Sequence, residues 1–332
     1  MSKSLNDVIS LLLDNDNFAI GIHANADGDC FGSACGLCSA LKKLGKNACI
    51  LSPMPLPKRL LFLNYNNDDI FIGTSGYESI KDKYTTLITV DVASDHLLDS
   101  LSEVYKQNNL LAIDHHSENT ITAKNVYVQS EASAAGEVIY KIICILEENC
   151  GKTLFDSSIA SSVFGAISSD TGCFKYSNVS PLTHIIASEL IKLGAFSADI
   201  NYRLFDLKTP AQIAAERLAY QKLEFFFDGR LSFIYLSDED LNEICAAPSD
   251  TETVSQLGRG IEGVQIAAFM RKKEEGVYKF SVRSNNEADM SKLCASFGVG
   301  GGHKKAAGCS IFTHCADTAK EMFLDKAKDY LE

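Results

Sequence analysis

Short acidic side chains and imidazoles gather in four stretches of the sequence, and each stretch follows an apolar run. The first is HANADGD at residues 23–29, directly after FAIGI. The others are VDVAS at 90–94, AIDHH at 112–116 and SSDTG at 168–172. Such side chains can bind metal ions together, because the carboxyl ends of parallel strands meet at one edge of a sheet. The candidate ligands are His23, Asp27, Asp29, Asp91, Asp114, His115, His116 and Asp170.

The chemistry of this set indicates both a metal and a reaction. Oxygen and imidazole donors without a thiolate favour Mn²⁺ or Mg²⁺ over structural zinc. The set also exceeds the need of one octahedral ion that must still bind substrate. Two ions about 3.5–4 Å apart that share a bridging carboxylate would use the whole set of ligands. Such a pair of ions would hydrolyse phosphoesters. A lone histidine or turn is usually structural, but four such segments presented by one sheet favour the catalytic interpretation.

The bulk composition limits the setting. With 332 residues, the chain is too long for one ordinary domain. No apolar run is long enough to cross a membrane, and the eleven scattered cysteines suit free thiols in the cytoplasm. The net charge of −12 argues against tracking of long nucleic acid. A basic cluster late in the chain favours a small anion or a very short oligonucleotide instead.

The apolar periodicity predicts the elements that position these side chains. Strands are expected at 18–22, 47–51, 86–91 and 109–114, and helices at 134–148, 157–168 and 182–193. A further helix follows the first motif and ends near Gly45. This alternation predicts an α/β fold, with a mostly parallel sheet and helices on both faces.

After Gly194 the pattern changes to hairpins. Turns at Asp228-Gly229 and at KKEEG each separate two apolar runs. A short helix near 288–296, the glycine run GVGGGHKKAAG, a strand and a final helix from about 316 complete the chain. We expect a smaller α+β domain here. The predicted domains are 1–194 and 215–332, joined by a helical connector at 195–214.

The four motifs occur in the order and spacing of the DHH phosphoesterase superfamily, which the chain resembles over essentially its whole length. FSVRSNN at 280–286 and the glycine run resemble the substrate-binding domain often attached to it. The resemblance implies a metal-dependent hydrolase with two Mn²⁺ ions, for which Mg²⁺ or Co²⁺ could substitute. Ala26 stands where the family usually has proline, but this departure removes no ligand.

The resemblance also implies a role for each residue of the motifs. His23 and Asp27 would bind one ion, and Asp29, His115 and Asp170 would bind the other. Asp91 would bridge the two ions. In catalysis, Asp114 would support a ligand from behind, while His116 would face the substrate.

The architecture most resembles cytoplasmic oligoribonucleases that degrade very short RNA and dephosphorylate 3′-phosphoadenosine 5′-phosphate. By that resemblance, Arg283 and His303 would hold a substrate phosphate from across an interdomain cleft. Ser284 and the backbone of Gly300, Gly301 and Gly302 would complete this contact, because glycines let N–H groups approach an anion closely. Arg259 in LGRGIEG is a further candidate.

Other functions stay open at this point. A stand-alone phosphodiesterase for cyclic di-AMP or linear pApA would have a similar sequence. A manganese pyrophosphatase should crowd more basic residues around its small anion. A nucleotide-sensing module without catalysis would be expected to lack metal ligands, and none is missing. Short RNA and small nucleotides are the expected partners, without a membrane, and a homodimer is left open.

Overall fold

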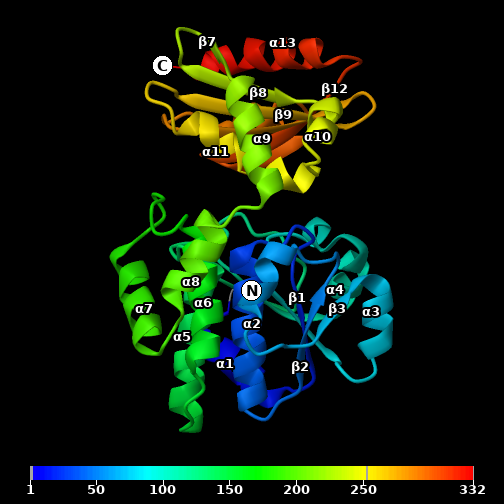
Figure 1. The fold of residues 1–332 in the computed structure, drawn as a ribbon. Helices are drawn as coiled ribbons and strands as arrows, with labels where there is room; N and C mark the ends of the chain where they lie inside the picture. Colours follow the sequence, from blue (N-terminus) through cyan, green and yellow to red (C-terminus); the bar gives the residue numbers. More distant parts are fainter. Residues whose placement is uncertain (1–2, 252, 332) are drawn as a thin grey trace. The chain divides into compact units, whose positions relative to one another are not determined.

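The computed structural model describes residues 3–251 and 253–331, which form two compact units (Figure 1). Unit 1 is Met1–Leu207 and unit 2 is Lys208–Glu332. The division lies within the segment 195–214 that the sequence predicts as a connector. Among the described residues, no helix has both the length and the apolar character that crossing a membrane requires.

Unit 1 is built on a six-stranded sheet in which all neighbouring strands are parallel. Its strands are β1 Phe18–Gly21, β2 Ala48–Ser52, β3 Ile70–Ile72, β4 Thr86–Val90, β5 Asn109–Asp114 and β6 Asn125–Val128, in the spatial order β3-β2-β1-β4-β5-β6. Chain order reverses between β1 and β4. In sheets of this kind, the carboxyl ends of the strands at the reversal are the usual position of a ligand site.

Helices cover both faces of this sheet because successive strand residues alternate between two cores. Phe18 and Ile20 of β1 pack with α1, α2, α5 and α6, whereas Ala19 packs with α3 and α4. Figure 1 shows these two groups of helices. The helices of unit 1 are α1 Leu5–Asp14, α2 Gly28–Lys43, α3 Gly73–Ile80, α4 Ser102–Asn108, α5 Ala135–Cys150, α6 Ser157–Asp170, α7 Pro181–Lys192 and α8 Ser197–Asn201, with the shorter helical segments η1 Lys58–Leu63, η2 Asp95–Leu101 and η3 Tyr202–Asp206.

Helices α2 and α6 approach closely because α2 presents glycines to α6. A Cβ atom on Gly32 would lie 2.6 Å from the Ser162 carbonyl oxygen and 3.0 Å from the Ala166 nitrogen. A Cβ atom on Gly36 would lie 2.6 Å from Cγ2 of Val163. The first turn of α2 and the last turn of α6 carry site residues, so this close packing fixes the distance between them.

Unit 2 contains a second six-stranded sheet of mixed direction. Its strands are β7 Glu224–Phe226, β8 Leu231–Leu236, β9 Ile266–Glu274, β10 Val277–Ser284, β11 Gly300–His303 and β12 Ala306–Phe312, in the order β11-β12-β10-β9-β8-β7. Its helices are α9 Pro210–Gln221, α10 Asp238–Glu243, α11 Val254–Arg259, α12 Met290–Ala295 and α13 Ala316–Ala327, with η4 Pro248–Thr251 and η5 Lys328–Tyr330. One core lies against α12 and α13, and a smaller one against α9, α10 and α11.

The predicted α/β class, with a parallel sheet covered on both faces, is confirmed. Two edge strands of unit 1, β3 and β6, were not predicted. The glycine run was not predicted as a strand, but part of it forms β11, which pairs with β12 from Gly300–Cys309 to His303–Ala306. Residues 1–2, 252 and 332 lie outside the description.

The glycine contact between α2 and α6 predicts that Gly32→Val destabilises unit 1. The new side chain must displace backbone atoms of α6, and overpacking of this kind costs about 1–3 kcal/mol. Denaturant titration should show this loss in the free energy of unfolding. The control is Gly260→Val, where a Cβ atom would meet its nearest neighbours at 3.6 and 3.9 Å. Equal stability of the two variants would contradict the packing argument.

Candidate metal centre

Asp91 follows β4 directly and lies at the centre of the candidate site. Its backbone has a left-handed φ of 58°, and its N–H donates to the Ile113 carbonyl at 2.9 Å. The side chain is only 3 % exposed. Within the described residues, its Oδ1 atom has no hydrogen-bond partner. A buried carboxylate oxygen without a partner is costly, and a bound cation would satisfy it.

His115 connects Asp91 to two other carboxylates. Its Nδ1–H can donate to the Ala132 carbonyl at 3.2 Å, which leaves the Nε2 lone pair as an acceptor. This Nε2 lies 3.6 Å from Oδ2 of Asp29, 3.6 Å from Oδ1 of Asp91 and 3.8 Å from Oδ2 of Asp170. A lone pair facing three carboxylates at these distances is the arrangement that a metal ion between them would stabilise.

Asp29 is oriented by the helix that it caps. The N-cap residue of α5, Ala134, makes no side-chain cap. The Asp29 carboxylate replaces it by accepting from the backbone N–H groups of Ala135 at 2.7 Å and Gly136 at 2.9 Å. The Ser33 hydroxyl donates to Oδ1 at 3.1 Å. Asp29 therefore combines a local role in helix capping with a position beside His115.

His116 and Asp114 form a hydrogen-bonded pair beside this cluster. Nδ1 of His116 lies 2.8 Å from Oδ1 of Asp114 and 3.5 Å from Oδ1 of Asp91. Oδ1 of Asp114 also accepts from the backbone N–H of His115 at 2.7 Å, and the Asn119 amide donates to Oδ2. Asp114 is fully buried. It thus fixes the orientation of His116 and the backbone of both histidines.

The remaining predicted ligands lie around the amino-terminal end of α2. Nε2 of His23, which follows β1, is 3.9 Å from Oδ2 of Asp91. Asp27 is the N-cap of α2, and its Oδ1 accepts from the Cys30 N–H at 3.0 Å. Among the described residues, ligand atoms fall into three groups that share members: His23, Cys30 and Asp91; Asp29, His115 and Asp170; and Asp91, Asp114, His115 and His116.

The first of these groups contains Cys30, which the sequence did not single out, and it does not contain Asp27. The Cys30 thiol lies 3.4 Å from the Val90 carbonyl and 3.8 Å from the Asp91 carbonyl. No sequence signal indicated this position, because a cysteine after Asp29 looks like any other apolar residue of a buried helix. Asp27 stays a predicted ligand that also caps α2.

The electrostatics of the site follow from burial and crowding. Burial and the charges of Asp170 and Asp27 raise the pKa of Asp29 well above its ordinary value. Burial and the charges of Asp29 and Asp27 do the same to the pKa of Asp91. Burial and Asp27 raise the pKa of Asp170 to about 7. Without a cation, these carboxylates resist ionisation together.

The histidines differ in the direction of their shifts. Burial lowers the pKa of both His23 and His115, so both rings are neutral and can act as ligands at neutral pH. Burial also acts to lower the pKa of His116, but the hydrogen bond and the charge of Asp114 outweigh it and raise this pKa. The same pairing lowers the pKa of Asp114 despite its burial.

The residues predicted to bind substrate lie in unit 2. Arg283 and Ser284 end β10, and the Ser284 hydroxyl donates to the Ala288 carbonyl at 3.3 Å. A Cβ atom on Gly300 would lie 2.5 Å from the Cys294 carbonyl oxygen, whereas one on Gly301 would meet nothing within 4 Å. Gly302 has a left-handed φ of 138°. Close packing therefore explains Gly300, and the left-handed backbone explains Gly302. Of these three glycines, only Gly301 has no atom near its Cβ position and leaves space for a ligand. The side chain of His303 lies outside the described part of the structure.

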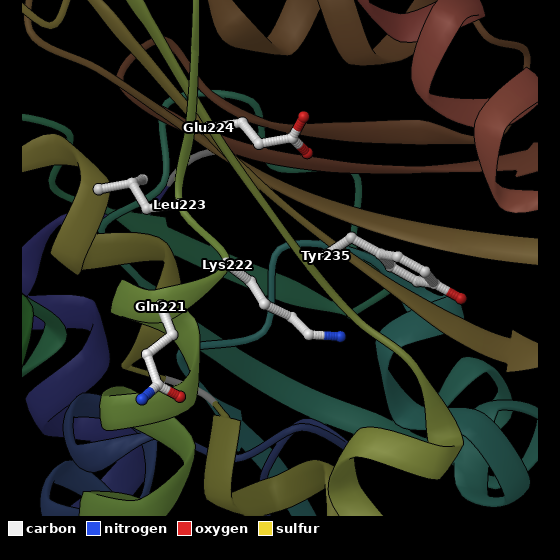
Figure 2. A pocket seen from close by; sticks show the side chains of 5 residues that line it. All are labelled: Gln221, Lys222, Leu223, Glu224 and Tyr235. Carbon is white, nitrogen blue, oxygen red and sulfur yellow. The ribbon is translucent and has the colours of Figure 1, made fainter.

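A pocket of about 330 Å³ elsewhere in unit 2 includes none of these residues. Figure 2 shows its lining side chains, which are Gln221, Lys222, Leu223, Glu224 and Tyr235. Two of its charges are already paired, Lys222 with Asp240 and Glu224 with Lys320. This pocket adds nothing to the metal centre.

Comparison with known proteins supports one family across both units. Residues 17–167 match the N-terminal domain of the DHH family, and residues 243–332 match the DHHA1 domain. A bifunctional oligoribonuclease and PAP phosphatase NrnA from Thermus thermophilus is 28% identical over 315 residues, which cover 94% of this chain and 89% of the relative. The protein of the same name from Bacillus subtilis is 24% identical over 300 residues, which cover 90% of each chain.

Solved structures share the fold. An exopolyphosphatase-related protein from Bacteroides fragilis has a TM-score of 0.89 at 22% identity, over 98% of this chain and 96% of its own. RecJ from Thermus thermophilus in complex with Mn²⁺ has a TM-score of 0.59 at 14% identity, over 99% of this chain and 55% of its own. Both domain models match this chain in succession, and the alignments with the two NrnA proteins cover 90% or more of it, so the chain belongs to the DHH family of metal-dependent phosphoesterases.

Proposed function

We propose that this enzyme hydrolyses short oligoribonucleotides and 3′-phosphoadenosine 5′-phosphate with two Mn²⁺ ions bound around Asp91. The observation that carries the proposal is the buried, unpartnered Oδ1 of Asp91 between two histidines of the AIDHH motif. The names of the relatives from Thermus thermophilus and Bacillus subtilis, an oligoribonuclease and PAP phosphatase, support this choice of substrates. The cytoplasmic location and the homodimer left open by the sequence stay predictions.

The donor set fits a two-ion site of this kind. We assign His23 and Asp27 to one ion and Asp29, His115 and Asp170 to the other, with Asp91 shared. Cys30 is not assigned as a ligand, because its thiol is placed to donate to the Val90 carbonyl at 3.4 Å. The remaining oxygen and imidazole donors favour Mn²⁺, with Mg²⁺ or Co²⁺ as substitutes. When bound, two ions would lower the pKa of a water molecule and neutralise charge on the phosphoryl oxygens.

His116 and Asp114 supply the proton chemistry of this proposal. Asp114 accepts from Nδ1 of His116 and raises its pKa, so a protonated ring is stabilised near neutral pH. A protonated imidazole carries a second N–H on Nε2. We assign this proton to the leaving oxygen of the substrate, where general-acid catalysis contributes about 10²–10⁴-fold. Asp114 acts through His116 and holds its orientation.

Arg283 is assigned to a phosphate that is not cleaved. A guanidinium forks onto phosphate oxygens and stays charged at any physiological pH. We assign three further residues to the same contact: Gly301 through its open backbone, His303, and Ser284 at the end of β10. This assignment makes unit 2 the source of nucleotide specificity.

A substrate panel tests the proposed activity. With Mn²⁺, the protein should hydrolyse two- to five-nucleotide RNA, pApA included, and 3′-phosphoadenosine 5′-phosphate faster than cyclic di-AMP or pyrophosphate. A preference for cyclic di-AMP, or for pApA over both longer RNA and 3′-phosphoadenosine 5′-phosphate, would instead establish a dinucleotide phosphodiesterase. Failure on every substrate at full metal occupancy would overturn the proposal.

Asp91→Asn should abolish turnover while the fold stays largely intact. The variant loses the charge that we place between both ions, so manganese binding should weaken at both sites. Isothermal titration calorimetry and hydrolysis rates would measure the two effects. Asp82→Asn, at an exposed position, is the matched control. Near wild-type hydrolysis by Asp91→Asn would contradict the two-metal assignment.

Asp170→Asn should change stability in a pH-dependent direction when metal is removed by a chelator. Asp170 keeps its proton in the folded protein up to about pH 7, whereas the unfolded chain loses it near 3.8. Between these pH values the unfolded chain releases the proton and the folded protein keeps it, so the free energy of unfolding falls as the pH rises. This cost is complete above about pH 7, where Asp170 is ionised in both states. The variant should match the wild type near pH 4 and, at pH 7.5, melt about 2–4 °C higher for each kcal/mol of this cost.

Added Mn²⁺ should make the wild type melt at a higher temperature than Asp170→Asn, because only the wild type keeps the Asp170 carboxylate as a charged ligand. Differential scanning fluorimetry with and without Mn²⁺ would measure both differences. A stability difference that does not vary with pH would show that Asp170 is not forced to hold a proton by its neighbours.

Arg283→Ala should lower kcat/KM for nucleotides by about 10- to 100-fold, the range for loss of a hydrogen bond to a charged group. Bis-p-nitrophenyl phosphate carries only the ester to be cleaved and should be affected far less. Manganese content should not change. The control Arg271→Ala alters the neighbouring strand, β9. Equal losses on both kinds of substrate would show that Arg283 serves the fold instead.

A further inference from the structure

A second arginine of unit 2 is held in place by the segment that follows Arg283. Asn285 accepts from Nε of Arg259 at 3.1 Å through its Oδ1. Its Nδ2 donates to the Arg259 carbonyl at 2.8 Å and to the Val264 carbonyl at 2.9 Å. The Asn285 backbone N–H donates to the Gln265 backbone carbonyl at 2.8 Å. One exposed asparagine thus ties the end of α11 to the end of β10.

The register of the sheet places Arg283 on the face that α11 covers. Arg283 pairs with Ala267 on β9 and with Ala306 on β12. Directly paired residues project from the same face of a sheet. Gly258 of α11 packs on that face, because a Cβ atom there would lie 3.3 Å from Cβ of Ala267. Arg259 follows Gly258, so it lies on the same side of the sheet as Arg283.

The neighbours of Arg283 in this row are small. Ala267 and Ala306 flank it on the two adjacent strands, and Ser232 is the next residue along the row, on β8. The residues paired with Arg283 are thus small, and its guanidinium donates through Nη1 to the Val282 carbonyl at 3.0 Å. The preceding residue of β10, Val282, belongs to the opposite, apolar face with α12 and α13.

We propose that Arg259, positioned by Asn285, is a second phosphate-recognition residue of unit 2. This inference rests on the proposed function and extends it to substrate choice. Two guanidinium groups on one face suit the phosphate that is not cleaved, because both can form charge-assisted bonds to its oxygens. The substrates selected in this way are nucleoside bisphosphates and short oligonucleotides with a 5′-phosphate. A nucleotide with one phosphate places that phosphate at the proposed metal centre, so none is left for Arg259.

The position of Asn285 explains how this contact is kept specific. Arginine has many rotamers, and fixing one costs conformational entropy at each binding event. The bond from Nε to Asn285 restricts the plane of the Arg259 guanidinium before a ligand arrives. Asn285 is therefore a positioning residue, and it acts through Arg259.

Kinetics of paired dinucleotides test the role of Arg259. Arg259→Gln should lower kcat/KM for pApA by about 10- to 100-fold. It should leave ApA, which lacks the 5′-phosphate, within about threefold of the wild type. Arg271→Gln is the control, since Arg271 lies on β9 at the position opposite Lys279. Equal losses on pApA and ApA, or a loss no larger than that of Arg271→Gln, would overturn the inference.

A double-mutant cycle tests the role of Asn285. Asn285→Ala should reproduce the selective loss on pApA, and the double variant Arg259→Gln/Asn285→Ala should be no worse than Arg259→Gln alone. Additive losses in the double variant would mean that Asn285 only supports the fold. A loss of the same size on ApA would mean the same.

Equilibrium binding separates this inference from the proposed activity. Calorimetry of the full chain should show that Arg259→Gln weakens adenosine 3′,5′-bisphosphate by about tenfold and leaves adenosine 5′-monophosphate unchanged. If the wild type hydrolyses neither dinucleotide, the proposed function fails, and this binding difference still decides the role of Arg259. Equal binding of both nucleotides by wild type and variant would exclude that role.

Discussion

Repulsion between two buried carboxylates and a half-buried one is the constraint that organises unit 1. Asp29, Asp91 and Asp170 surround a single neutral imidazole nitrogen of His115 at 3.6 to 3.8 Å. Each of these carboxyl groups has a raised pKa because burial and like charge disfavour ionisation. The fold therefore stores unfavourable electrostatic energy that a divalent cation can release. Metal binding at these residues would be thermodynamically linked to folding.

The backbone overcomes this repulsion in several ways. Asp29 is stabilised by the N–H groups at the start of α5, where the helix dipole favours a negative charge. Asp91 is held at a strand end in a left-handed conformation, and such strained positions persist only where their surroundings determine them. Asp170 is held by α6, whose distance from α2 is set by Gly32 and Gly36. A helix cap, a strand end and a helix contact each contribute one carboxylate.

Unit 2 uses a different principle, because its candidate residues are cations placed on a sheet face with small neighbours. Arg283 is presented by strand pairing with Ala267 and Ala306. Arg259 is presented by a helix end and fixed by Asn285. We accordingly propose a division of chemistry between the units: carboxylates and imidazoles for metal ions in unit 1, and guanidinium groups for phosphates in unit 2. The net charge of −12 hides this separation.

The sequence by itself determined the α/β class, the four central strands of unit 1 and the motifs at their ends, because buried parallel strands have strong apolar runs and the motifs are local. It did not reveal the edge strands β3 and β6, which are short and only partly buried. It also did not predict the strand Gly300–His303, since glycine disfavours strands and only pairing with β12 stabilises β11.

Tertiary structure alone decided the contacts between distant segments. The capping of α5 by Asp29, the approach of Cys30 to Asp91 and the bond from Arg259 to Asn285 all join residues far apart in the chain. Local sequence patterns report which face of an element is buried, but they contain no information about which other element covers it. Those distances depend on side-chain volumes at helix and strand contacts, so only the folded chain fixes them.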